Sequence, residues 1–246
     1  MKIGIDLDGV VFDSEKEFRV YSELYDMLDL KQNSKINNKE LKFQSRFKWT
    51  KEDIDGFLNK YHKQIIVESN FMPGVKRILK LLKEDGHTIV IITGRDNGEY
   101  SDPYNMTKKW LREKEIPYDK LIFTKYKKEK AEKCIENGID VMIDDSNSIC
   151  RECYKKNITT LIMDKPCNRE EKEITRVYNW KEIYEFITNY KKEKVNVILD
   201  TDMDTECDDH FALAYLLKNQ DKFNIDAITI APHSHDEIEE TIAEAT

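Results

Sequence analysis

The chain has 246 residues, of which 39% are hydrophobic and 36% charged, and its mean hydropathy is −0.69. This composition predicts a folded protein of one large domain, or of one domain with a further piece, and excludes a small disulfide-stapled scaffold. No apolar run approaches the ~18 residues of a membrane-spanning helix, and two acids within the first eight positions argue against a secretory signal. We therefore expect a cytoplasmic protein without a membrane partner.

Charge is distributed unevenly along the chain. Residues 195–246 carry 13 acidic residues against two lysines, whereas residues 1–194 are close to neutral. Such a change in charge predicts a domain boundary near residue 194. The near-neutral first part has no basic track, so we expect no nucleic-acid polymer as a partner.

Short Ile/Val/Leu-rich runs alternate with segments of helical spacing in the first part. The predicted strands are 2–7, 87–93, 120–124, 140–144 and 159–163, and the predicted helices are 75–85, 106–114, 128–137 and 180–193. This alternation is typical of α/β proteins and predicts a Rossmann-like, doubly wound parallel sheet. Between 13 and 73 the strand signal is missing, and residues 15–28 and 51–66 have helical spacing. We therefore expect a helical cap, about 14–72, inserted after the first strand of a core formed by 1–13 and 73–194.

Residues 195–246 predict a second, partial βαβα unit. Its expected strands are 195–200 and 223–231, and its expected helices are 209–219 and 236–245. So small a unit cannot cover both faces of its apolar strands, so we expect it to be marginally stable alone.

The five cysteines are an odd number, which argues against a disulfide framework. Cys150 and Cys153 form a C-x-x-C pair that could hold zinc together with Cys167. No second pair and no histidine pair lies nearby, so buried or idle thiols are the favoured interpretation.

Carboxylates gather where predicted strands end. Asp6 and Asp8 close the first strand run, Asp144 and Asp145 close the fourth, and Thr93 ends the second. Parallel strands bring their carboxyl ends to one edge of the sheet, where ligands bind. Acids after strands are often only turn or cap residues. So many at converging strand ends instead indicate an all-oxygen site of the kind that Mg²⁺ prefers.

The motif order D-x-D-G-V-V, T-G-R, a downstream lysine and D-D resembles that of the haloacid dehalogenase (HAD) superfamily of phosphatases over residues 1–194. The early helical cap and the phrase G-I-D-V-M-I-D-D are similar to its 5′-nucleotidase branch, which includes the deoxyribonucleotidases. The resemblance implies a Mg²⁺-dependent phosphomonoesterase that dephosphorylates nucleoside monophosphates through an aspartyl phosphate. A phosphatase for sugar phosphates or other small phosphoesters, and a non-catalytic nucleotide-binding relic, remain alternatives. The oligomeric state is not indicated.

The same resemblance implies roles for the carboxylates. Asp6 would be the nucleophile, and Asp8 would protonate the leaving group and later activate water. Mg²⁺ would be held by Asp6, the backbone carbonyl of Asp8 and Asp144, with Asp145 binding through water or orienting the other ligands.

The phosphoryl group would be bound by Thr93 and Gly94, with a lysine that offsets its charge. The K-x-x-x-C spacing of the branch selects Lys130, with Lys128 as the alternative. Arg95 could reach the phosphate or pair with a neighbouring aspartate.

The cap is expected to select the substrate. Arg46, Phe47 and Trp49, with Phe43 nearby, offer a cation and aromatic faces suited to stacking a nucleobase. The favoured interpretation of the aromatic residues is that they form the cap's own small core.

In the acidic unit, Asp202, Asp208 and Asp209 resemble the calcium motif of inosine-uridine type nucleoside hydrolases. The resemblance implies a vestigial, weak Ca²⁺ site. The spacer within the motif is two residues too long and the unit is far shorter than that family's domain, so we expect no nucleoside hydrolysis.

Overall fold

The computed structural model describes residues 1–36, 43–95, 102–126, 129–190, 194–201, 207–220 and 222–230. The chain divides into two compact units, Met1–Thr188 and Asn189–Thr246. Among the described residues, no helix combines the length and the apolar character needed to cross a membrane.

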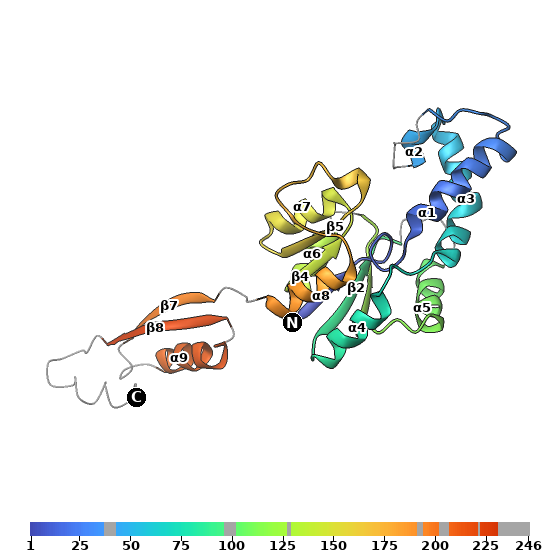
Figure 1. The fold of residues 1–246 in the computed structure, drawn as a ribbon. Helices are drawn as coiled ribbons and strands as arrows, with labels where there is room; N and C mark the ends of the chain where they lie inside the picture. Colours follow the sequence, from blue (N-terminus) through green and yellow to red (C-terminus); the bar gives the residue numbers. More distant parts are fainter. Residues whose placement is uncertain are drawn as a thin grey trace, which may run out of the picture. The chain divides into compact units, whose positions relative to one another are not determined.

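The first unit, drawn in Figure 1, is built on a parallel sheet. The sheet has six strands in the order β3-β2-β1-β4-β5-β6. The strands are β1 (Lys2–Ile5), β2 (Thr88–Thr93), β3 (Lys120–Phe123), β4 (Val141–Asp144), β5 (Thr159–Met163) and β6 (Thr175–Val177). β1 lies in the middle, with Ile3 paired to Ile89 of β2 on one side and to Val141 of β4 on the other. β2 and β3 lie on one side of β1, whereas β4, β5 and β6 lie on the other, so the strand order reverses between β1 and β4. Sheets of this kind bind ligands at the point of reversal. The predicted α/β fold class is confirmed.

Helices cover both faces of this sheet. They are α4 (Val75–Glu84), α5 (Pro103–Glu113), α6 (Glu129–Glu136), α7 (Asn147–Lys155) and α8 (Trp180–Asn189). Val90 and Ile92 of β2 pack in one buried cluster with Cys134 of α6 and Cys153 of α7. Because side chains alternate along a strand, the intervening Ile91 faces the opposite side. Figure 1 shows α4 and α8 on that side.

Trp180, the first residue of α8, connects the last helix of the first unit to the loop after β1. Its side chain is buried, and its indole Nε1 donates a hydrogen bond to the carbonyl oxygen of Val10 at 2.9 Å. The loop that follows the first strand is therefore held by a residue near the end of the unit.

The cap consists of α1 (Ser14–Leu24), a π-helical turn η1 (Tyr25–Asp29), the short α2 (Phe43–Arg46) and α3 (Lys51–Glu68). The two chain segments that enter and leave the cap are joined by backbone hydrogen bonds, from Asp13 N to the Asn70 carbonyl and from Met72 N to the Val11 carbonyl, both at 2.9 Å. The cap is thus attached to the core through one two-stranded connection.

Three local features differ from the sequence prediction. The helix expected over 15–28 changes at Tyr25 to π-helical spacing, with Leu30 N bonded to the Tyr25 carbonyl. Helix α7 and the three-residue strand β6 were not predicted. The C-x-x-C pair, Cys150 and Cys153, lies on the buried face of α7 as free thiols. The interpretation of these two cysteines as buried thiols therefore agrees with the structure.

The second unit contains β7 (Val195–Thr201), α9 (Asp208–Lys218) and β8 (Phe223–Ile230), with the strands parallel. Large apolar side chains of all its parts are exposed, among them Ile198 at 65% and Phe211 at 71%. This exposure agrees with a unit too small to cover its own strands. The predicted helix 236–245 lies outside the described residues.

Candidate active site

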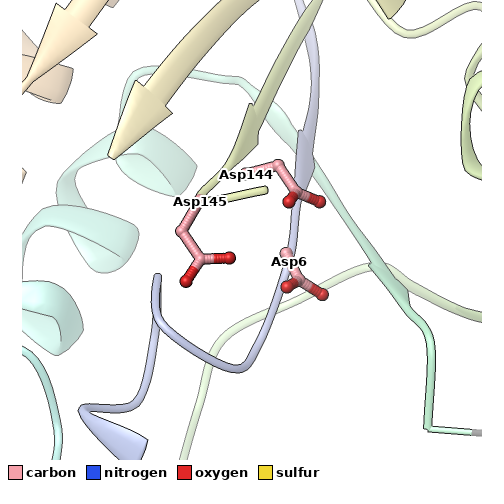
Figure 2. A group of neighbouring side chains, drawn as sticks. All are labelled: Asp6, Asp144 and Asp145. Atoms are coloured by element: carbon pink, nitrogen blue, oxygen red, sulfur yellow. The ribbon is translucent and has the colours of Figure 1, made fainter. Parts of the chain in front are cut away.

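Three carboxylates meet at the carboxyl edge of the sheet (Figure 2). Asp6 directly follows β1, Asp144 ends β4 and Asp145 follows it, and one oxygen from each lies within 4.8 Å of the others. The backbone amide of Ser146 donates to Asp144 Oδ1 at 2.8 Å and fixes that carboxylate. The adjacency of β1 and β4 in the sheet is therefore what brings the two motifs together.

Gly9 allows the loop after β1 to approach this cluster. Its φ angle is +82°, and a Cβ atom at this position would lie 2.0 Å from Asp145 Oδ2. Both the left-handed backbone and the close approach require glycine. The glycine of the D-x-D-G motif thus makes room for the second carboxylate of the D-D motif.

Lys130 is the cation of the cluster. Its Nζ lies 2.7 Å from Asp6 Oδ1 and 2.8 Å from Asp144 Oδ2, and the side chain is buried. Burial disfavours its charge, but the attraction of Asp144 and Asp6 outweighs this and raises the pKa of Lys130. Helix α6 places Lys130 on the same buried face as Cys134, four residues later. Lys128, the alternative, lies outside the described residues.

The cluster still lacks positive charge. Burial and the neighbouring carboxylates, opposed by Lys130, raise the pKa of Asp6 to about 7. Burial, followed by the repulsion of Asp144 and Asp6, raises the pKa of Asp145 well above its usual range. Lys130, and Lys165 that also attracts Asp145, therefore do not offset the charge that three ionised carboxylates would carry.

A hard divalent cation fits these donors. In the part of the chain that the structure describes, Asp6, Asp144 and Asp145 are the one group of three or more potential ligands of this kind. All of their ligand atoms are oxygens, the set that Mg²⁺ prefers. This group consists of side-chain atoms alone, so the predicted contact through the backbone carbonyl of Asp8 stays a prediction.

Asp8 forms a two-bonded ion pair with Arg95. The arginine Nε lies 2.8 Å from Oδ2 and Nη2 lies 2.7 Å from Oδ1. Burial would raise the pKa of Asp8, but Arg95 outweighs it and lowers that pKa. Arg95 was expected to reach either phosphate or a neighbouring aspartate such as Asp102. Its partner across the site, Asp8, was not predicted.

An aromatic pair that the sequence analysis did not single out supports Arg95. The guanidinium lies 5.0 Å from the ring centroid of Trp110 and 5.9 Å from that of Phe12, and the two ring centroids are 3.7 Å apart. Two features of the sequence could have indicated this pair. Phe12 comes just after the first motif, and Trp110 occupies an apolar position in the helix predicted over 106–114.

The end of β2 offers a free hydroxyl. Thr93 is fully buried, and its Oγ1 has no hydrogen-bond partner in the described part of the chain. A buried hydroxyl without a partner is costly, so a ligand that accepts its hydrogen bond would be favoured. Beside it, the Cβ position of Gly94 has no atom within 4 Å. These two residues thus leave space and one donor for an incoming oxygen.

The predicted substrate-binding residues of the cap pack against each other. Arg46 is buried and its Nη2 lies 2.5 Å from Glu23 Oε1. The rings of Phe47 and Trp49 are stacked, with centroids 4.5 Å apart, and Trp49 Nε1 donates to Asp26 Oδ1 at 2.8 Å. The contacts favour the interpretation of a cap core, and the role in base stacking stays a prediction. The side chain of Phe43 lies outside what the structure describes.

In the second unit, Asp208 and Asp209 begin α9, and Asp208 is exposed. Asp202 lies outside the described residues, so the calcium site also stays a prediction.

Comparison with known proteins assigns the family. Residues 1–193 match the family model described as 5′ nucleotidase, deoxy (pyrimidine), cytosolic type C protein. A nucleotidase of Clostridium acetobutylicum is 30% identical over 135 residues, which cover 54% of this chain and 67% of that protein. A candidate 5′(3′)-deoxyribonucleotidase of Chlorobaculum tepidum is 27% identical over 127 residues, 51% of this chain and 59% of that protein.

A solved structure supports the fold. A haloacid dehalogenase-like hydrolase of Streptococcus pneumoniae superposes with a TM-score of 0.57 at 14% identity, covering 76% of this chain and 97% of that one. At this identity the likeness concerns the fold. Together with the family match over most of the chain, it shows that the chain belongs to the 5′-nucleotidase family of HAD-type proteins and is a phosphomonoester hydrolase.

Proposed function

We propose that the chain is a Mg²⁺-dependent 5′-nucleotidase that dephosphorylates nucleoside monophosphates through an aspartyl phosphate on Asp6. The observation that carries this proposal is the group formed at the edge of the sheet by the buried Asp6, Asp144 and Lys130 with the half-buried Asp145. The two relatives, named as a nucleotidase and a candidate deoxyribonucleotidase, support a nucleotide as the substrate.

In the first half-reaction, a carboxylate oxygen of Asp6 attacks phosphorus and the bond from phosphorus to the nucleoside 5′-oxygen breaks. The departing alkoxide takes a proton from the carboxyl group of Asp8. Lys130 lies beside the attacking carboxylate and favours its ionised form. Thr93 Oγ1, which is buried without a partner, donates a hydrogen bond to a phosphoryl oxygen.

In the second half-reaction, water attacks phosphorus and gives a proton to the carboxylate of Asp8. The bond between phosphorus and Asp6 breaks, so inorganic phosphate leaves and the free carboxylate returns. The products are the nucleoside and phosphate, and no oxidant or reductant is needed.

Asp6, Asp144 and Asp145 are the residues that would hold Mg²⁺. When bound, the ion offsets the negative charge shared by the phosphate and the carboxylates. Ca²⁺ prefers more ligands in a looser arrangement and should not replace it.

The substrate class is tested by measuring phosphate release from a panel of nucleoside monophosphates and sugar phosphates. We expect the nucleotides to be preferred, and a tenfold preference for sugar phosphates would instead favour the alternative phosphatase. The nucleophile is tested with Asp6→Asn, which should abolish turnover. Full activity in excess chelator would remove Mg²⁺ from the proposal.

A further inference from the structure

We propose that Arg95 is a positioning residue that holds the carboxyl group of Asp8 in the orientation needed for proton transfer to the leaving group. The inference rests on the proposed function, in which Asp8 gives a proton to the leaving group and then takes one from the attacking water. The ion pair favours the carboxylate that water needs, while its geometry orients the same group toward the leaving oxygen. It differs from the role considered from the sequence, in which Arg95 binds the phosphate of the substrate.

The geometry of the pair carries the inference. Arg95 bonds both oxygens of Asp8, at 2.8 and 2.7 Å, through Nε and Nη2. Two parallel bonds from a planar guanidinium fix the rotation of a carboxylate as well as its position, which a single bond from a lysine does not. The Arg95 side chain is 3% exposed, against 33% for Asp8. The buried guanidinium of Arg95 therefore holds the carboxylate of Asp8, which remains accessible to a ligand.

Arg95 is itself held in place by aromatic rings. Its guanidinium lies against Trp110 and Phe12, at 5.0 and 5.9 Å from the ring centroids. Phe12 also forms an isolated backbone bridge with Asp8. Phe12 thus contacts the backbone of Asp8. Arg95, which packs against Phe12 and Trp110, holds the side chain of Asp8.

A positioning role predicts dependence on the leaving group. A nucleoside alkoxide is strongly basic and needs a proton from Asp8 as it departs, whereas p-nitrophenolate is weakly basic and leaves without one. The ratio kcat/KM measures the barrier from free enzyme and substrate, and departure of the leaving group lies within that barrier. Loss of Arg95 should therefore lower kcat/KM for the nucleotide and spare that for the aryl phosphate.

The test compares Arg95→Gln with the wild-type chain on a nucleoside monophosphate and on p-nitrophenyl phosphate. We expect kcat/KM to fall about 10- to 100-fold for the nucleotide, part of the effect of a full acid, and less than about threefold for the aryl phosphate. Arg95→Lys, which keeps the charge without the two-bonded geometry, should fall between wild type and Arg95→Gln. The matched control is Arg112→Gln, which removes an exposed arginine from α5 and should change neither value.

Equal losses on both substrates would show that Arg95 binds the phosphate and would overturn the proposal, as would no loss on the nucleotide. In an Asp8→Asn background, Arg95→Gln should cause no further loss, and additive losses would also contradict it. If Arg95→Gln fails to fold, Arg95→Lys provides the same comparison between substrates. A wild-type chain that hydrolyses sugar phosphates instead of nucleotides would refute the proposed substrate, while the leaving-group comparison on that substrate would still test Arg95.

Discussion

Gly9 shows how a residue without a side chain can set the geometry of a site. Its φ angle of +82° disfavours any other residue, and Gly74 has the same φ angle. A Cβ at Gly9 would lie 2.0 Å from Asp145 Oδ2, whereas a Cβ at Gly74 would have no atom within 4 Å. A comparison of the two positions therefore distinguishes the cost of the left-handed backbone from the cost of the contact with Asp145.

We predict that Gly9→Ala and Gly74→Ala each lower the free energy of unfolding by about 1–2 kcal/mol, because both place alanine in the left-handed region. Only Gly9→Ala should also weaken Mg²⁺ binding and reduce phosphate release, because Asp145 must move. Urea unfolding and an Mg²⁺ titration of activity measure the two effects. Equal activity of the two variants would show that the contact with Asp145 is unimportant.

Lys130 lies between two buried carboxylates, so its removal leaves them unpaired. We predict that Lys130→Met lowers the free energy of unfolding by about 3–5 kcal/mol in the presence of chelator. Mg²⁺ should recover part of this loss, because an ion bound only by the folded state stabilises it. Lys133→Met is the control, because this lysine of the same helix is partly exposed and pairs with the exposed Glu136, and it should cost less than about 1 kcal/mol. A Lys130 variant as stable as this control would contradict the assignment.

The sequence predicts these site residues unequally well. The positions of Asp6, Thr93 and Asp144 follow from where buried strands end, and parallel strands end at one edge. Lys130 follows from helical spacing with Cys134. The pair of Arg95 with Asp8 does not follow, because a long side chain can reach several acids and its direction depends on packing against Trp110 and Phe12.

At the scale of elements, α7 was missed because its buried face is made of Ile149, Cys150 and Cys153. Cysteines with this spacing were considered as metal ligands, although the same spacing places them on one side of a helix. Strand β6 has three residues and too little pattern to be seen. In the structure it pairs in parallel with β5, and Arg176 of β6 forms an ion pair with Asp164.

Asp164, just after β5, accepts hydrogen bonds from Arg169 at 2.8 Å and from Arg176 of β6 at 3.0 Å. The hydrogen bond from Arg169, opposed by partial burial, lowers the pKa of Asp164 in the folded protein. The unfolded chain thus takes up a proton at higher pH than the folded one, near the usual value of about 3.9. The stability that Asp164 contributes is present above that pH and is lost as pH falls through the lowered pKa.

We therefore predict that Asp164→Asn is less stable than the wild type at pH 7 and that the difference shrinks as pH falls below about 4. Urea unfolding at several pH values measures it. Asp55→Asn, which removes an exposed carboxylate of α3, should keep the pH dependence of the wild type. A constant difference between Asp164→Asn and the wild type at all pH values would contradict the role of the ion pairs.

At the scale of the whole molecule, the predicted boundary near residue 194 and the compact unit that ends at Thr188 lie within a few residues of each other. The described site residues of the phosphatase all lie in the first unit. We predict that a chain ending at Lys194 keeps phosphate release within about twofold, since separated sites contribute independently.

The contrasting variant ends at Asn179 and so loses α8 with Trp180. It should lose activity, because the hydrogen bond from Trp180 to the Val10 carbonyl and the cover of one sheet face disappear together. Phosphate release and circular dichroism distinguish the two shortened chains. Loss of activity in the longer one would show that residues 195–246 belong to the catalytic domain.

The contact between Trp180 and Val10 has a consequence during translation. The two residues are 170 positions apart, a delay of roughly 10–30 s on the ribosome. β1 emerges first but lies between β2 and β4, and its loop is held by a helix made much later. The apolar first strand therefore cannot be paired on both sides until β4 has been made, and we expect the nascent chain to hydrolyse no substrate until Trp180 has left the exit tunnel.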